Sequence, residues 1–244
     1  TIGLLPLYAL NEIGYKKIIH LSSVSYLKNA ELSDPHVTFD YLLNNTEGIA
    51  LFSGTVFGLF GQLFDKGKFT EIHDLYNKIK SKFGDRFYIE IQRHKDLNEN
   101  SFEKFNLKKS SDLEVPIIAT NEVYYLNKNM HEAHDALICI GNKTYVNEKN
   151  RLKLTDQHYF KNNSEMSELF ADLPEALENN YNFPLRCNYR PLFSNPILPN
   201  ISQDKGGDAD EILKKESLEG LRTKFEKVFR VSINDIETEK SYLD

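Results

Sequence analysis

Residues 115–142, VPIIATNEVYYLNKNMHEAHDALICIGN, decide the fold, because here an apolar run leads directly into polar residues and then into a helical pattern. The run Pro116–Thr120 is short, apolar and β-branched, which predicts a strand covered on both faces. Over 132–140, apolar residues recur at helical spacing and predict a helix that buries these side chains: Ala133, Ala136, Leu137 and Ile140. A strand, a loop and a covering helix in this order indicate a parallel α/β fold.

Polar residues at the end of this strand are the first candidates for a functional site. In parallel α/β folds, the side chains that follow the carboxyl end of a strand face the ligand. We therefore expect Asn121, Glu122 and Tyr124 to line the site. His94 lies just past the end of another predicted strand, 87–91, and is expected at the same edge of the sheet.

The rest of the chain up to residue 190 alternates between strand and helix patterns, with strands every ~30 to 40 residues, as parallel α/β units require. Further strands are predicted over 2–9, 49–52 and 87–91. Helices are predicted over 11–27, 37–43, 56–64, 69–83, 100–107, 164–170 and 174–182, with an irregular stretch over 142–160. Asn11 and Ser164 are the expected N-caps of two of these helices.

A stretch rich in proline, asparagine and serine, residues 193–205, separates this region from a helical pattern over 209–230. We therefore expect a domain over 1–190, a connection over 191–207 and the beginning of a second domain over 208–244. Thr1 is not an initiator methionine, and the first strand has no predicted partner upstream, so we expect a fragment of a longer protein.

Several stretches, all in the same order, are similar to the PHP (polymerase and histidinol phosphatase) domain of the bacterial DNA polymerase III alpha subunits, which are replicative polymerases of the C family. They are LNEIGYKKIIHLSS at 10–23, EGIALFSG at 47–54, FYIEIQRH at 87–94, ATNEVYYL at 119–126, EAHDALICI at 132–140 and ELFADLPEAL at 168–177. The resemblance implies an α/β fold, an incomplete (β/α)7 PHP-type barrel whose first strands are missing here. It also implies that 208–244 is the helical start of the polymerase palm region.

The resemblance further implies which positions would hold metal, since active PHP domains bind divalent metals that activate water for phosphoester hydrolysis. Leu4 stands where the family has His, Thr55 where it has Cys, and Glu122 and Tyr124 where it has Asp-x-His. Three of these four positions lack a family ligand, so we expect a degenerate, metal-free domain without catalytic residues. The alternative is an active metal-dependent phosphoesterase or 3′–5′ exonuclease, which would need histidines before Thr1 together with Glu122.

For the full-length protein, the resemblance implies a DNA-directed DNA polymerase, a nucleotidyltransferase that acts on DNA primer-template and dNTPs with Mg²⁺. The fragment would support the polymerase core and dock the proofreading exonuclease subunit. The sliding clamp and other replisome subunits are further partners that the resemblance implies. The chain itself contains no pattern of acidic residues that would hold the two metals of a polymerase site.

Composition sets broader limits. The net charge of −6 gives no basic excess of the kind that marks an autonomous nucleic-acid binder. No stretch approaches the ~20 apolar residues of a membrane span, so we expect no membrane partner. Cys139 and Cys187 lie far apart without a C-x-x-C pattern, which favours buried thiols in a reducing cytoplasm.

The remaining histidines give weaker patterns. His131 and His134 lie three apart on a predicted helix, but this is not H-E-x-x-H spacing and no third ligand is evident, so we predict structural or surface roles. Tyr124 and Tyr125 are expected to fill the space that a metal would occupy in the family, with base stacking as the alternative. Four histidines have no partner pattern in the sequence: His20, His36, His73 and His158.

Overall fold

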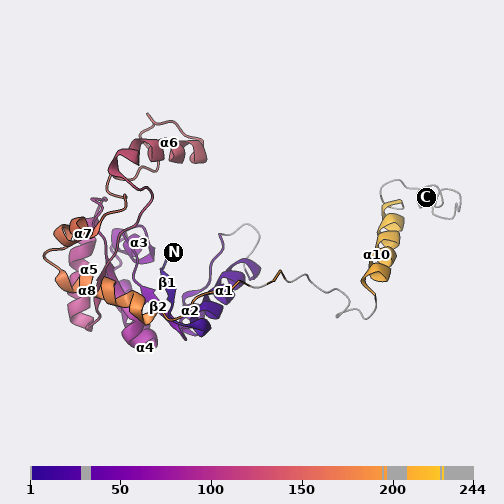
Figure 1. The fold of residues 1–244 in the computed structure, drawn as a ribbon, viewed down its shortest axis with the longest axis horizontal. Helices are drawn as coiled ribbons and strands as arrows, with labels where there is room; N and C mark the ends of the chain where they lie inside the picture. The colour runs from indigo at the N-terminus through magenta and orange to yellow at the C-terminus, as the bar shows by residue number, and fades with distance from the viewer. Residues whose placement is uncertain (1, 29–33, 194, 197–207, 226, 228–244) are drawn as a thin grey trace. The chain divides into compact units, whose positions relative to one another are not determined.

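The computed structural model of this protein describes residues 2–28, 34–193, 195–196, 208–225 and 227. The chain divides into two compact units, Thr1–Arg190 and Pro191–Asp244 (Figure 1). In the second unit the described residues include one α-helix, α10 (Ala209–Lys224), none of whose residues is buried. Most of the predicted continuation of this helix to residue 230 lies outside the described residues.

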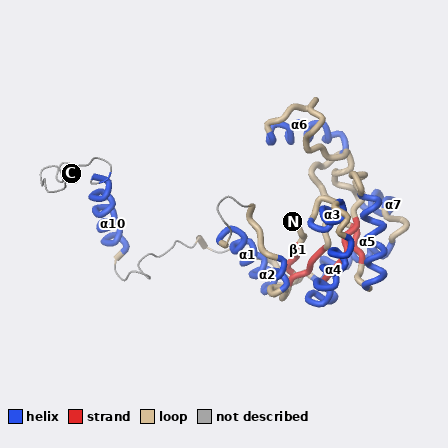
Figure 2. The backbone as a smooth tube through the Cα atoms, turned by 180° about the vertical axis from the view of Figure 1, so that it is seen from behind, coloured by secondary structure: helices blue, strands red, loops and turns tan. Residues whose placement is uncertain are grey.

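Four strands form the sheet of the first unit, in the order β1-β2-β3-β4 (red in Figure 2). The strands β2, β3 and β4 are parallel, whereas β1 pairs with β2 in the antiparallel direction. The predicted α/β class is therefore confirmed, but β1 departs from the parallel pattern. The backbone N–H of Leu10 donates to Gly48 O at 2.8 Å, which fixes the end of β1 beside the start of β2. The strand bounds are Leu7–Ala9, Ile49–Phe52, Phe87–Ile91 and Ile117–Ala119.

Eight α-helices are described in the first unit, most of them at the predicted positions. The helix α5 runs six residues past its predicted end at Leu107, and α7 is capped by Asn162, not by Ser164. The reason for the second difference is a capping box, in which Asn162 and Glu165 bond each other's backbone N–H groups. The bounds are α1 Glu12–Leu27, α2 Phe39–Leu43, α3 Leu59–Asp65, α4 Phe69–Phe83, α5 Glu99–Leu113, α6 His131–Asn142, α7 Asn163–Leu169 and α8 Pro174–Asn182.

Both faces of the sheet are covered, as the continuous apolar strands predict. All residues of β2, β3 and β4 are buried, including Glu90. On one face, alternate residues such as Leu51, Ile89 and Ile117 pack with residues of α3, α4, α5 and α8. On the other face, Ala50, Phe52, Tyr88 and Ile118 pack with Leu10 and Phe183. The apolar core therefore holds the three parallel strands in place from both sides.

The face of α6 that the sequence predicts to be buried is exposed, so that prediction was wrong. Leu137 and Ile140 are 62% and 75% exposed, and the buried residues of the helix are Asp135 and Cys139. The guanidinium of Arg151 donates to both carboxylate oxygens of Asp135, at 2.6 and 2.7 Å, so an ion pair selects the buried face. Figures 1 and 2 show α6 standing away from the helices around the sheet.

Gly14 of α1 packs tightly against the turn that precedes β2. A Cβ added at Gly14 would lie 1.8 Å from Gly48 O, far inside van der Waals contact. We expect Gly14→Ala to lower the free energy of unfolding by about 1–3 kcal/mol, because the backbone has to shift. Urea unfolding followed by circular dichroism measures this change.

Gly141→Ala is the matched control, since Gly141 also lies in a helix but an added Cβ there meets nothing within 4 Å. This change should raise helix stability by up to about 1 kcal/mol. Equal urea midpoints for the two variants would contradict the close approach between α1 and Gly48.

Candidate functional site

Three loops meet at the carboxyl edge of the parallel strands, because parallel pairing brings the ends of β2, β3 and β4 to one side of the sheet. The predicted mouth residues His94 and Asn121 are in contact there, with His94 Nε2 3.0 Å from Asn121 Oδ1. The backbone N of Glu122 lies 3.2 Å from the same ring nitrogen. The structure thus brings together the three residues that the sequence places at this edge.

The four positions that the family resemblance marks for metal all line one cavity of about 440 Å³. Leu4 is 80% exposed and offers no ligand atom, and the hydroxyl of Thr55 accepts the backbone N–H of Phe57 at 3.2 Å. The Tyr124 hydroxyl donates to Glu122 Oε1 at 2.8 Å. Glu122 is therefore the single strong donor of the four, which does not fit a multinuclear metal cluster.

Tyr124 keeps its proton over the physiological range. Burial and then the neighbouring Glu122 raise the pKa of Tyr124 to about 12. The phenol therefore remains a hydrogen-bond donor to the carboxylate of Glu122. Its ring also stacks on His134, with centroids 5.5 Å apart.

His94 is 1% exposed and is fixed on several sides. Its backbone N–H donates to Glu99 Oε1 at 2.6 Å, at the start of α5. Burial, followed by the nearby His158, lowers the pKa of His94 to about 4, so the ring is neutral at pH 7. A buried neutral imidazole is a hydrogen-bonding group and also a ligand for transition metals.

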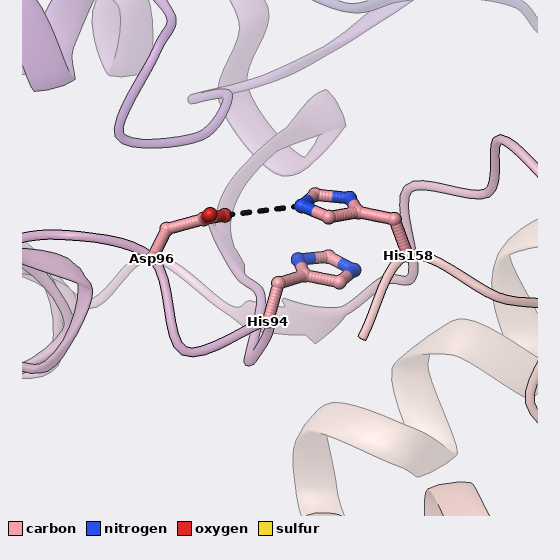
Figure 3. Close-up of side chains that lie close together, drawn as sticks. All are labelled: His94, Asp96 and His158. Atoms are coloured by element: carbon pink, nitrogen blue, oxygen red, sulfur yellow. Dashed lines mark ion pairs between the residues drawn. The ribbon is translucent and has the colours of Figure 1, made fainter. Parts of the chain in front are cut away.

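His158 is the residue of the site that sequence reasoning missed, because the sequence shows no partner pattern for it. It is fully buried and its ring stacks on that of His94, with centroids 4.2 Å apart and an interplanar angle of 5°. His158 Nε2 lies 3.3 Å from Asp96 Oδ2, also missed (Figure 3). His158 lies in the irregular stretch 142–160, where no periodic pattern points to a strand end, so no local signal could have identified it.

The segment that carries His158 is held against the loop after β4 by backbone hydrogen bonds. Tyr124 N donates to His158 O at 2.9 Å, and Phe160 N donates to Tyr125 O at 3.0 Å. The Thr155 hydroxyl donates to the carbonyl of His94. These contacts place an imidazole from a distant part of the sequence at the end of β3.

His94, Asp96 and His158 could hold a metal ion. Each offers one ligand atom, and the three atoms lie within 4.8 Å of one another, the one such group among the described residues. Imidazole nitrogen and carboxylate oxygen are ligands that zinc accepts. The expectation that the domain as a whole is metal-free is therefore not confirmed.

Arg93 links three elements beside the site. Its guanidinium donates to both oxygens of Glu103, at 2.6 and 3.0 Å, and to both oxygens of Asp172, at 2.6 and 2.8 Å. It also donates to Leu169 O at 2.7 Å and lies over the ring of Phe170. These contacts tie the end of β3 to α5 and to the α7–α8 connection, which is a structural role.

The other sequence candidates have local partners. His131 Nε2 lies 2.9 Å from Leu154 O, in keeping with its predicted structural role. Cys139 is a buried free thiol as predicted, whereas the free thiol of Cys187 is only half-buried. No helix in the described part of the chain has both the length and the apolar character that crossing a membrane demands.

Comparison with known proteins agrees with the resemblance noted in the sequence. Residues 3–94 match the PHP domain family. The chain is 38% identical over 222 residues to the DNA polymerase III subunit alpha of Caulobacter vibrioides, covering 91% of this chain and 19% of that protein. It is 34% identical over 235 residues to the DNA polymerase III subunit alpha of Rickettsia bellii, and this match covers 96% of this chain and 20% of that protein. The DNA polymerase III subunit alpha of Borreliella burgdorferi is 35% identical over 224 residues, and this match covers 91% of this chain and 19% of that protein.

The chain therefore spans about one fifth of the length of the curated relatives that it matches. Nine-tenths or more of this chain takes part in each match, so the likeness extends well beyond residues 3–94. The second half of the site, which includes Asn121, Glu122 and His158, lies outside the PHP match itself.

Glu90 is a buried carboxyl group close to this edge. Gln92 Nε2 donates to its Oε1 at 3.1 Å and the Thr120 hydroxyl donates to the same oxygen, while Oε2 is buried without a hydrogen-bond partner. Burial is the main cause that raises the pKa of Glu90 above its ordinary value of 4.5. The folded state therefore binds this proton more tightly than the unfolded state, and stability falls as the pH rises above 4.5.

We expect Glu90→Gln to raise the free energy of unfolding at pH 8 and to flatten its decline with pH, because the amide carries no charge to bury. Urea unfolding between pH 5 and pH 8 measures both effects. Glu175→Gln is the control, since Glu175 is exposed on α8 and its charge stays in water. A wild-type decline that persists unchanged in Glu90→Gln would show that Glu90 is not its source.

Proposed function

We propose that this chain, whose residues 3–94 belong to a PHP domain, is part of the alpha subunit of a replicative DNA polymerase and serves there as a structural scaffold. The likeness to DNA polymerase III alpha subunits runs along nearly the whole chain and supports this assignment. The full-length protein would be a DNA-directed DNA polymerase, with Mg²⁺ at a palm site that this chain does not contain.

The observation that carries the scaffold role is the donor set around the cavity. Leu4 and Tyr124 offer no family ligand atom, and Thr55 offers only a neutral hydroxyl. Glu122 is satisfied by the Tyr124 hydroxyl. A hydrolytic PHP site needs several metal ions to activate water, and this cavity lacks the ligands to hold them. The domain would therefore support the polymerase core without hydrolytic activity of its own.

The proposed partners follow from the same assignment. The full-length subunit would bind primer-template DNA and dNTPs and would act with the sliding clamp and other replisome subunits in the cytoplasm. The proofreading exonuclease subunit would dock on the region that includes this chain.

A working phosphoesterase or 3′–5′ exonuclease is the second candidate, and the carboxylate of Glu122 is the observation that favours it. Glu122 stands at the family ligand position and lines the cavity. This activity would need further metal ligands from outside the described residues, in addition to Glu122. The two candidates therefore differ in what replacing Glu122 does to hydrolysis.

We expect Glu122→Gln in the full-length polymerase to leave primer extension within about twofold of the wild type, because the amide oxygen still accepts the Tyr124 hydroxyl. Extension of a primed template by both proteins measures this. Glu122→Ala should behave likewise in extension but lower the melting temperature, since the tyrosine donor then lacks its partner.

The same proteins should not shorten single-stranded DNA from its 3′ end in the presence of Mn²⁺ or Zn²⁺. Hydrolysis by the wild type that disappears equally in both Glu122 variants, at unchanged melting temperature, would establish the phosphoesterase and overturn the scaffold role. Loss of primer extension in Glu122→Gln would contradict the proposal as well.

A further inference from the structure

The hydrogen bonds of His158 fix the position of its proton. Its Nδ1 lies 3.2 Å from the backbone carbonyl oxygen of Glu122. A carbonyl oxygen only accepts, so Nδ1 carries the proton and donates it. In the neutral ring, Nε2 then carries no proton and has a free lone pair. This atom is buried and makes no hydrogen bond, although the carboxylate of Asp96 lies 3.3 Å away.

The ring of His94 is fixed through Asn121. Asn121 Nδ2 donates to Tyr159 O at 3.0 Å, and its Oδ1 accepts from Lys161 Nζ at 3.2 Å, so the amide orientation is set. The two bonds to His94 Nε2 correspond to two tautomers of the ring. With the proton on Nε2, His94 donates to Asn121 Oδ1 at 3.0 Å. With the proton on Nδ1, Nε2 accepts the backbone N–H of Glu122 at 3.2 Å. The first tautomer, in which Nδ1 carries a second lone pair, is the one that can bind a metal ion through Nδ1.

Both lone pairs lie on the same side of the ring stack. Figure 3 shows one nitrogen of His94 and one of His158 on the side that faces Asp96. In this tautomer, two imidazole lone pairs and a carboxylate converge in a buried place, and they repel one another unless a positive charge lies between them. Two more carboxylates stand close by: Glu99 Oε1 is 3.8 Å from His94 Nδ1, and Glu122 Oε2 is 3.9 Å from His158 Nδ1.

We propose that His94 Nδ1, Asp96 and His158 Nε2 bind a single zinc ion, at a site distinct from the four family ligand positions around the cavity. Bonds of about 2.0–2.2 Å at a tetrahedral angle put two ligand atoms about 3.3–3.6 Å apart, and His158 Nε2 and Asp96 Oδ2 are 3.3 Å apart. The second nitrogen of each ring bonds an oxygen, Asn121 Oδ1 or Glu122 O. This outer arrangement is the usual one for zinc-bound histidines.

The ring stack defines what has to move when the ion binds. An imidazole binds a metal in its own plane, and the two rings are parallel with centroids 4.2 Å apart. One ring therefore has to turn about its Cβ–Cγ bond for both nitrogens to reach one ion. Three protein ligands leave the fourth position of a tetrahedral zinc ion to water.

The ion would link two segments that are distant in sequence. His94 and Asp96 lie between β3 and α5, whereas His158 lies between α6 and α7. A zinc ion here would fix the residue 121–161 segment to the edge of the sheet. This role is structural, it needs no hydrolytic activity, and it holds whether or not the scaffold proposal is correct.

The principal competitor for the ion is a proton on His158 Nε2, which would make an imidazolium–aspartate pair. Zinc titration of the full chain separates the two, after the chain is stripped with EDTA and dialysed. We expect one equivalent of Zn²⁺ by isothermal titration calorimetry, and Co²⁺ in its place should give the visible absorption of a tetrahedral site. The melting temperature should rise with Zn²⁺.

His158→Gln and Asp96→Asn should weaken zinc binding by at least about 100-fold, since even loss of an outer partner costs about 10–100-fold. His131→Gln is the matched control, because His131 binds a backbone carbonyl in the same segment and should keep the full equivalent. For a variant that does not fold, X-ray absorption of the zinc-loaded wild type provides the test, and two imidazoles in the first shell are expected.

Absence of a bound equivalent in the wild type would overturn the proposal, and so would unchanged affinity in His158→Gln. An ion lost in Glu122→Gln but kept in His158→Gln would belong to the cavity positions and would equally overturn it. Fewer than two imidazole ligands to zinc in the X-ray absorption spectrum would also overturn the proposal. None of these results alters primer extension, so this proposal and the scaffold role fail separately.

Discussion

The parallel pairing of β2, β3 and β4 is the constraint on which the rest of the first unit depends. It brings three strand ends to one edge, where the chain must leave the apolar core and satisfy its polar groups. Ser53 does this after β2: its N–H donates to Tyr88 O at 3.0 Å and its hydroxyl accepts from Glu90 N at 2.9 Å. After β3, Ile91 O accepts from Thr120 N at 3.1 Å. Successive loops thus complete one another's hydrogen bonds.

The same edge concentrates buried ionisable groups, which are costly without partners. The guanidinium of Arg93 is paired with the carboxylates of Glu103 and Asp172, each of which it binds through both oxygens. The carboxylate of Glu90 is only partly hydrogen-bonded, because its Oε2 has no hydrogen-bond partner. The imidazole rings of His94 and His158 each have one nitrogen within hydrogen-bond distance of an oxygen, Asn121 Oδ1 for His94 and Glu122 O for His158. A proton or a metal ion between Asp96 and His158 Nε2, which lie 3.3 Å apart, would add a positive charge to this arrangement.

The cavity and the imidazole pair lie next to each other but differ in chemistry. Around the cavity, Leu4, Thr55 and Tyr124 offer an alkyl group, a neutral hydroxyl and a phenol. Glu122 faces the cavity with its carboxylate, and its backbone carbonyl accepts from His158. The loop after β4 therefore belongs to both places.

The sequence by itself determined the α/β class, the strands β2 to β4, most helices and the Asn11 cap, because these depend on periodicity and on neighbours within a few residues. It also placed His94 and Asn121 at one edge. Only the tertiary structure decided the buried face of α6, which an ion pair with Arg151 selects. It alone decided the meeting of His158 with His94 and Asp96. Contacts between residues so distant in sequence arise from chain packing, and no local pattern encodes them.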